Sequence, residues 1–295
     1  MKALRLATRT SALALVQSGS VAQSLRSLHP GLSVDIIPVR SEGDRRSDEP
    51  LSKAGGSGLF TGALEEALLR GEADFAVHSL KDLPTRMAPG LALAAVGPRE
   101  DWRDAWLSPA YASPWDMPPG ARVGTGSPRR RAQLQWRRPE LRFEELRGNV
   151  DTRLDKLADG VVDGAVLAMA GLKRLGLESR VRHVFSEREM LPAPGQGFLA
   201  VQTRLGEEAF RLCRALNDPE AEAEAACERA FLACLEAGCL APVGALARRE
   251  GAELTLEVFA ALDPGRPLRV RRSGNGNAPA ALGAGLAEEL LKGVE

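Results

Sequence analysis

Short apolar runs alternate with stretches of helical periodicity through the first two hundred residues. The apolar run at residues 3–8 is followed by a helical pattern over residues 11–28 and by a second apolar run at residues 34–39. Strand, helix and strand in this order are typical of α/β proteins with a largely parallel sheet. The pattern therefore predicts an α/β domain at the start of the chain.

A second series of the same kind begins near Arg99. Further apolar runs predict strands at residues 105–107, 122–124, 141–145 and 164–169, with helices starting at Ser127 and Asn149. A turn rich in proline and glycine at residues 192–197 suits a hinge, and a strand follows at 198–202. The series predicts a second sheet of its own.

The last eighty residues show a different order of elements. A long helix is predicted over residues 220–237, then strands at 243–247, 254–262 and 268–270, and a final helix at 281–291. This order predicts a small α+β domain.

Composition adds limits to this picture. A chain of 295 residues with 44% hydrophobic content supports two or three domains. The formal net charge is +0 and the pI about 6.9, so no global field attracts the protein to nucleic acid or to an anionic membrane. Charges interrupt the apolar run at the N-terminus and no stretch reaches spanning length, which indicates a cytoplasmic protein. The three histidines are scattered and the four cysteines lack paired CxxC spacing, so we expect no metal.

An acid and a base stand together at the end of a predicted strand. The apolar run at residues 74–77 leads into His78, and Lys81 and Asp82 follow. Open α/β sheets bind ligands at the carboxyl ends of their strands. Taken alone, Asp82 could equally be a turn residue and Lys81 a surface lysine, and His78 is better read as a structural histidine.

Arginines occur at the predicted starts of helices. Ser127 is a good N-cap and Pro128 fits the first helical position, which places Arg129 and Arg130 in the first turn. Cations there oppose the helix dipole at a cost of roughly 0.3 to 1 kcal/mol each, which an anion bound between them would offset. Taken alone, the run could be a solvated basic patch. Arg9 with Ser11, and Arg147 with Arg153, repeat the arrangement at two other helix starts.

The cysteines divide into two kinds. Cys227 and Cys234 are seven residues apart on one predicted helical face, which favours a buried structural role. Cys239 lies past the helix end in a turn of small residues, where its sulfur would be accessible. A thiolate there could act as a nucleophile.

Several motifs occur in an order that resembles the porphobilinogen deaminase (hydroxymethylbilane synthase) family. They are spread over some 240 residues of the chain, at positions 7–11, 53–60, 78–84, 124–130, 146–150, 192–197 and around Cys239. The resemblance implies two periplasmic-binding-protein-like α/β domains joined by a hinge, plus a small α+β C-terminal domain. The implied domains are residues 1–97 with 198–216, residues 98–197, and residues 217–295. The strand at 198–202 would therefore return to the first domain.

The resemblance also implies an activity. Four porphobilinogen molecules would be condensed head to tail with release of ammonia onto a dipyrromethane cofactor, and hydroxymethylbilane would be released. Asp82 would be the catalytic carboxylate and Cys239 would carry the cofactor through a thioether. The family is expected to act as a cytoplasmic monomer.

The resemblance also implies two sets of binding residues, one for the cofactor and one for the substrate. The cofactor set comprises Lys81, Arg129, Arg130, Ser127, Asp44 and Gly148, together with Cys239. The substrate set comprises Arg9, Ser11, Lys53, Phe60, Arg147, Arg153, Arg174 and Gln196. Residues 40–57, which include Asp44 and Lys53, form a long polar stretch with glycines that is expected to be a functional loop.

Two other classes of function compete with this interpretation. A hinged binding module for a small carboxylate or phosphate ligand, without chemistry, would account for the hinge and the arginines. Nucleic-acid binding is disfavoured by the neutral charge and by an aromatic content of 4%.

Overall fold

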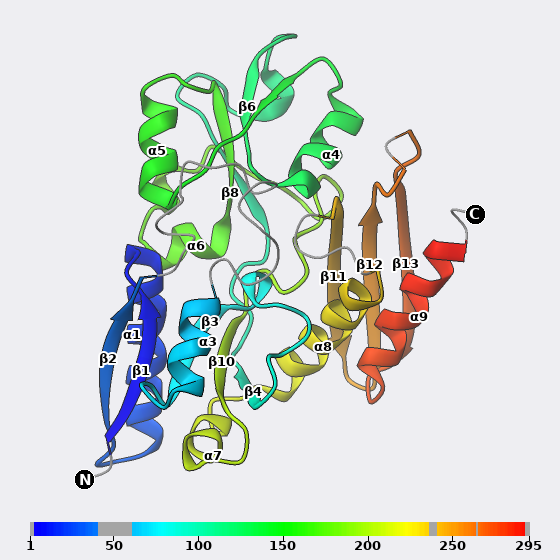
Figure 1. Cartoon of the computed structure of the whole chain (residues 1–295). Helices are drawn as coiled ribbons and strands as arrows, with labels where there is room; N and C mark the ends of the chain where they lie inside the picture. The colour runs from blue at the N-terminus through cyan, green and yellow to red at the C-terminus, as the bar shows by residue number, and fades with distance from the viewer. Residues whose placement is uncertain (1–2, 41–60, 236–240, 264, 293–295) are drawn as a thin grey trace.

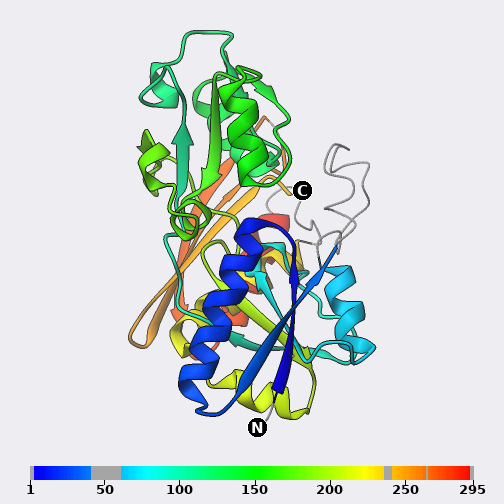
Figure 2. The same cartoon turned by 90° about the vertical axis from the view of Figure 1, so that its left-hand side faces the viewer.

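The computed structural model describes residues 3–40, 61–235, 241–263 and 265–292. Within these residues the chain forms three sheets, seen as three groups of strands in Figure 1. Their strand orders are β2-β1-β3-β10-β4, β7-β6-β8-β5-β9 and β11-β12-β13. Figure 2 shows the second sheet above the first, with the strands of the third behind them.

The first sheet combines the N-terminal strands with one that arrives late in the sequence. Its strands are β1 (Ala3–Arg9), β2 (Ser33–Val39), β3 (Phe75–Ser79), β4 (Leu91–Val96) and β10 (Leu199–Arg204). β1 is parallel to β2 and β3, whereas β10 is antiparallel to β3 and β4. The chain thus leaves this sheet after β4 and returns as β10, which confirms the predicted return of the strand at 198–202. We call these two connections between the first and second sheets the double crossing.

Helices cover both faces of the first sheet. They are α1 (Ala12–Leu28), α3 (Gly62–Leu69) and α7 (Glu208–Arg214). Leu4 and Leu6 of β1 share a buried cluster with residues of α1 and α7, whereas Ala7 belongs to a cluster with residues of α3. The alternation along β1 therefore directs successive side chains to opposite faces.

The second sheet has the same mixed character. Its strands are β5 (Asp104–Leu107), β6 (Arg122–Gly124), β7 (Arg142–Glu144), β8 (Gly164–Ala168) and β9 (His183–Val184). Its helices are α4 (Pro128–Arg137), α5 (Val150–Ala158) and α6 (Met169–Arg174). β6 is parallel to β7 and β8, and β5 is antiparallel to β8 and β9. This arrangement confirms a second sheet built from the series that begins near Arg99.

The third sheet is antiparallel, with β11 (Val243–Glu250), β12 (Glu253–Ala260) and β13 (Leu268–Asn275). Helices α8 (Pro219–Cys234) and α9 (Pro279–Lys292) lie against one face of it (Figure 1). Cys227 is fully buried there and Cys234 packs against the same cluster, as the helical spacing predicted. The three sheets and two crossings confirm the predicted fold class.

Several predicted boundaries were wrong, among them the end of the strand expected at 243–247, which extends to Glu250. The last strand was expected to span residues 268–270, but β13 extends to Asn275. The prediction fell short because Arg271 and Ser273, on the face away from the helices, are polar and do not continue the apolar pattern. The helix expected to reach residue 237 ends at Cys234.

All three sheets meet at the connections between the first two. Arg99 lies on the outgoing connection, and its Nη1 is 2.7 Å from Oε1 of the fully buried Glu228 of α8. Glu228 Oε2 accepts a hydrogen bond from the backbone N–H of Gly195 on the returning connection, at 2.6 Å. Arg99 Nε donates to the carbonyl of Gln196 at 3.0 Å. One carboxylate from the third domain therefore binds both connecting segments.

Packing between α8 and α9 yields a test of the third domain. A methyl group at Gly283 would lie 2.1 Å from the carbonyl oxygen of Cys227, whereas one at Gly285 would meet nothing within 4 Å. We expect Gly283→Ala to lower the free energy of unfolding by about 1 to 3 kcal/mol or more, because the helices must separate. Gly285→Ala should raise it by roughly 0.5 to 1 kcal/mol through helix propensity. Urea unfolding of both variants measures this, and equal effects would contradict the close helix packing.

Candidate active site

The carboxyl ends of β1 and β3 form one edge of the first sheet. β1 ends at Arg9, and β3 runs directly into a 3₁₀ turn, Leu80–Asp82. Leu80 is buried, and its backbone N–H donates to the carbonyl of Phe198 at 3.1 Å, which fixes the turn against the returning chain. Lys81 is half-buried and Asp82 is exposed at this edge.

Lys81 is an unusual ammonium group. Burial lowers its pKa to about 8, although the neighbouring charge of Asp82 acts in the opposite direction. Nζ donates a hydrogen bond to Oε1 of Gln196 at 3.3 Å. The lysine therefore connects the edge of the first sheet to the turn at residues 192–197.

The start of α4 has the geometry that its sequence predicts. Ser127 caps the helix, its Oγ accepting from the backbone N–H of Arg130 at 3.4 Å, and Pro128 occupies the first helical position. Arg129 and Arg130 are only 3% and 6% exposed. The alternative of a solvated basic patch is therefore wrong.

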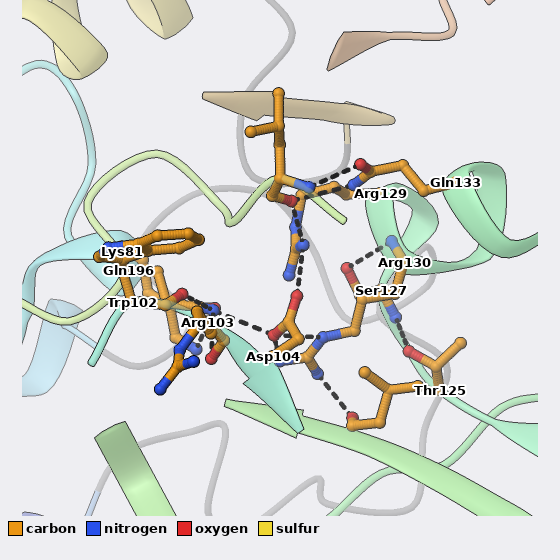
Figure 3. A network of polar contacts seen from close by, with 12 residues as sticks. Lys81, Trp102, Arg103, Asp104, Thr125, Ser127, Arg129, Arg130, Gln133 and Gln196 are labelled. Atoms are coloured by element: carbon orange, nitrogen blue, oxygen red, sulfur yellow. Dashed lines mark hydrogen bonds and ion pairs between the residues drawn. The ribbon is translucent and has the colours of Figure 1, made fainter. Parts of the chain in front are cut away.

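Asp104 at the start of β5 holds the two arginines in place. It is fully buried, and its Oδ2 lies 2.6 Å from Nη1 of Arg129. Its Oδ1 accepts from Nε and Nη2 of Arg130 at 3.1 and 2.7 Å, as Figure 3 shows. Burial alone would raise the pKa of this carboxyl, but the two guanidiniums hold it well below its usual range. Sequence reasoning missed Asp104, because an aspartate at the start of a short strand carries no local signal.

Gln196 joins this network to Lys81. The side chain is 1% exposed, and its Nε2 donates to Asp104 Oδ1 at 3.0 Å and to the carbonyl of Trp102 at 2.8 Å (Figure 3). Its Oε1 accepts from Lys81. The amide thus links the cation on the first sheet to the carboxylate on the second.

Two further arginines surround the start of α5. Arg153 Nε donates to the carbonyl of Gly148 at 2.8 Å, and Gly148 adopts a φ of 108° that favours glycine. Burial lowers the pKa of Arg153 to about 10, and the positive charges of Arg130 and Arg147 add to this while the negative charge of Asp82 opposes it. The charge of Asp82, on the first domain, therefore acts on Arg153 of the second.

Two guanidinium nitrogens have no hydrogen-bond partner among the described residues. Arg147 is 7% exposed, and its Nε lies 3.8 Å from Oε1 of Glu145. Arg147 Nη1 and Arg129 Nε are buried atoms for which the described residues supply no hydrogen bond. Buried donors without acceptors are costly, and a ligand carboxylate would satisfy them. The residues present therefore fit a group that carries carboxylates.

The remaining site predictions fall in different places. Ser11 caps α1, accepting from the backbone N–H of Ala14 at 3.4 Å. Arg174 Nη2 donates to the carbonyl of Gly197 at 2.8 Å, and burial lowers its pKa. The residues expected from the long polar stretch and the cysteine turn lie outside the described residues: Asp44, Lys53, Phe60 and Cys239.

His78 is buried, as a structural histidine should be. Burial lowers its pKa to about 4, so the ring is neutral at pH 7, and the charge of Arg9 adds to the shift. Its Nε2 nevertheless finds no hydrogen-bond partner among the described residues, so the ring is not fully satisfied.

Neither a metal centre nor a membrane span is present in the part of the chain that the structure describes. No group of three or more histidine, cysteine, aspartate or glutamate side chains there could hold a metal ion. No helix in these ranges is both long and apolar enough to cross a bilayer.

The fold and this edge define an α/β protein with two sheets joined by two connections, whose buried arginines and Lys81 lie near those connections. Two family models match the chain: the dipyrromethane cofactor binding domain of porphobilinogen deaminase over residues 4–211, and the C-terminal domain of porphobilinogen deaminase over residues 223–292. The chain belongs to the porphobilinogen deaminase family.

Individual relatives agree with this assignment. The chain is 48% identical to a porphobilinogen deaminase of Roseiflexus castenholzii, over 98% of this chain and 95% of the relative. It is 46% identical to a porphobilinogen deaminase of Thiobacillus denitrificans, over 99% and 96%.

Solved structures that align with this chain include periplasmic proteins. The methionine binding protein MetQ aligns with 77% of this chain and 94% of its own, at 16% identity and a TM-score of 0.48. A periplasmic substrate-binding protein of an ABC transporter from Coxiella burnetii aligns with 77% and 96%, at 16% identity and a TM-score of 0.47.

Removing the buried carboxylate should expose how much the network depends on it. Asp104→Asn leaves two buried guanidiniums without their counter-charge, so we expect a loss of about 3 to 5 kcal/mol in the free energy of unfolding. Asp163→Asn is the control, because Asp163 forms a comparable but only partly buried pair with Arg122, with side chains 30% and 41% exposed, and its loss should cost about 1 kcal/mol or less. Urea unfolding at pH 7 measures both. Similar losses would show that burial of Asp104 adds nothing.

The pKa of Lys81 can be measured directly. Its pKa is lowered to about 8, so its amine should become reactive as the pH rises through that value. Lys173 is the control, since its hydrogen bond to Glu100 raises its pKa above the usual value. Acetylation of the native protein at pH 6 to 11, followed by peptide mass spectrometry, should give half-maximal labelling of Lys81 at least two units below that of Lys173. Coincident profiles would contradict the lowered pKa of Lys81.

Proposed function

We propose that Asp82 is the catalytic carboxylate with which this chain condenses porphobilinogen. Members of the family join four porphobilinogen molecules head to tail, release ammonia, and form hydroxymethylbilane for tetrapyrrole biosynthesis. The observation that carries the assignment is the placement of exposed Asp82 at a strand end, electrostatically coupled to Arg153 of the second domain.

The chemistry of the substrate explains why a carboxylate suits this position. When the aminomethyl group of porphobilinogen loses ammonia, the pyrrole ring acquires positive charge and its N–H becomes more acidic. Asp82 can accept the hydrogen bond of that N–H and stabilise the charge as it develops. The same carboxylate can take up the proton that the attacked ring loses when the new carbon–carbon bond has formed.

The surrounding cations position the rings. Substrate and product carry acetate and propionate groups, and arginine forks bind carboxylates in a defined orientation. We assign this role to Arg147, whose buried Nη1 lacks a partner within the described structure, and to Arg153. The remaining proposed substrate contacts are Arg9, Ser11, Lys53, Phe60, Arg174 and Gln196.

We propose a second set of residues for the cofactor. When bound, dipyrromethane supplies the pyrrole carbon to which the first substrate ring is joined. We propose that Arg129, Arg130 and Lys81 hold its carboxylates, with Ser127 and Gly148 shaping the backbone around them. Asp44 and the attachment cysteine, Cys239, complete the proposed set.

The boundaries and assembly of the protein follow from the same proposal. We place the first domain at residues 1–97 with 198–216, the second at 98–197 and the third at 217–295. The strands of each sheet come from within these limits, which supports them. We propose that the protein works as a monomer in the cytoplasm.

Asp82→Asn should reduce turnover while preserving the fold, because it removes the charge but not the size of the side chain. A group of this kind is commonly worth on the order of 3 to 4 kcal/mol, which is about a hundredfold or more in rate. Asp155→Asn, on an exposed position of α5, is the matched control and should keep full activity. A rate for Asp82→Asn within tenfold of the parent would remove Asp82 from the catalytic role.

Intact mass tests the attachment of the cofactor. We expect the purified chain to be heavier than its sequence by two linked pyrrole units, and the excess to disappear in Cys239→Ser. Cys234→Ser should retain it, because Cys234 packs against the core of the third domain. An active parent protein without excess mass, or excess mass in Cys239→Ser, would refute attachment at Cys239. An unmodified, inactive parent that binds small carboxylates would favour the binding module instead.

A further inference from the structure

The third sheet has a second face, opposite α8 and α9. Leu256 and Val258 of β12 point into the helix-covered core, so Glu257 and Phe259 between and beyond them point the other way. Phe259 shares a buried cluster with Leu191, and its ring lies 6.0 Å from that of Trp136 on α4. The second domain therefore covers only part of this face.

Next to that contact the surface is hollowed into a groove of about 460 Å³. Its charged lining consists of Glu187, Arg188, Arg248, Glu257, Arg269 and Arg271, and we call it the arginine groove. The residues come from the segment that follows β9 and from all three strands of the third sheet. None of them belongs to the candidate active site.

The charges in the arginine groove do not cancel. Arg248 lies 2.6 Å from Glu187, and Arg269 lies 2.6 Å from Glu257, so both acids are paired. Arg188 and Arg271 are exposed and form no ion pair with any residue that the structure describes. Four arginines against two glutamates leave an excess of two positive charges, in a chain whose formal net charge is +0.

The walls of the arginine groove are held together before any ligand arrives. Arg269 donates from Nη1 to the carbonyl of Arg188 at 2.9 Å and from Nη2 to the carbonyl of Glu187 at 2.7 Å. These bonds fix the segment that carries Arg188 onto β13, two residues from Arg271. A preformed site loses less entropy on binding than one that must be assembled.

We propose that the arginine groove binds a small anion with at least two carboxylate or phosphate groups. Arg188 and Arg271 supply forks without acidic partners among the described residues, and guanidinium forks match both kinds of group in bidentate geometry. The excess positive charge of the lining attracts an anion. Because the groove joins the second and third domains, bound anion stabilises their contact.

Isothermal titration of the full-length, cofactor-loaded protein in low-salt buffer tests this proposal. The probes are citrate for carboxylates and pyrophosphate for phosphates. The groove variant is Arg188→Ala with Arg271→Ala, both exposed positions whose loss should leave the melting temperature without ligand unchanged. The control is Arg272→Ala, since Arg272 is the next residue on β13, points to the opposite face and pairs with Glu289.

We expect one saturable site for at least one probe in the parent protein and in the control, with at least tenfold weaker binding in the groove variant. The probe that binds more tightly identifies the preferred group. The same probe should raise the melting temperature of the parent and not that of the groove variant. Absence of saturable binding of either probe at millimolar concentration, or equal affinity in parent and groove variant, would overturn the proposal. Both results are independent of whether Asp82 is the catalytic residue.

Discussion

The candidate active site depends on one buried carboxylate. Asp104 pairs with both Arg129 and Arg130 away from water, and it does so from a strand rather than from the helix that carries them. Burying two guanidiniums without such a partner would cost several kcal/mol each. Because Gln196 bonds to the same carboxylate and to Lys81, the position of the first-domain lysine also depends on it. One strand residue therefore sets the place of three cations.

A second buried carboxylate, Glu228, likewise joins segments that are distant in sequence. Glu228 comes from the third domain, yet it binds Arg99 on one connection and the backbone of Gly195 on the other. Any rotation of the first two domains must take place about segments held by this side chain. The third domain thus binds both connecting segments, and it is also the proposed carrier of the cofactor.

Local sequence signals predicted much of this arrangement. Ser127 and Pro128 located the start of α4, and the apolar run before His78 placed Asp82 at a strand end, because capping and strand patterns depend only on neighbouring residues. Family resemblance was needed for the return of β10, since pairing across a hundred residues leaves no local trace. Asp104 and Glu228 were missed for a similar reason. A buried acid is recognisable only by partners that are distant in sequence, and the hydrogen bond from Arg174 to the carbonyl of Gly197 is likewise not revealed by the residues around it.

The double crossing has a consequence for how the chain folds. β4 and β10 are hydrogen-bonded neighbours, with Val96 opposite Ala200, so the second domain occupies the place of an ordinary hairpin turn. The two ends of the second domain meet where Nε of Arg99 donates a hydrogen bond to the carbonyl oxygen of Gln196, at 3.0 Å. Once the second domain has folded, the long loop between β4 and β10 is already closed. The entropy lost on closing that loop then belongs to the folding of the second domain. The first sheet can then add its late strand as readily as if the two strands were adjacent in sequence.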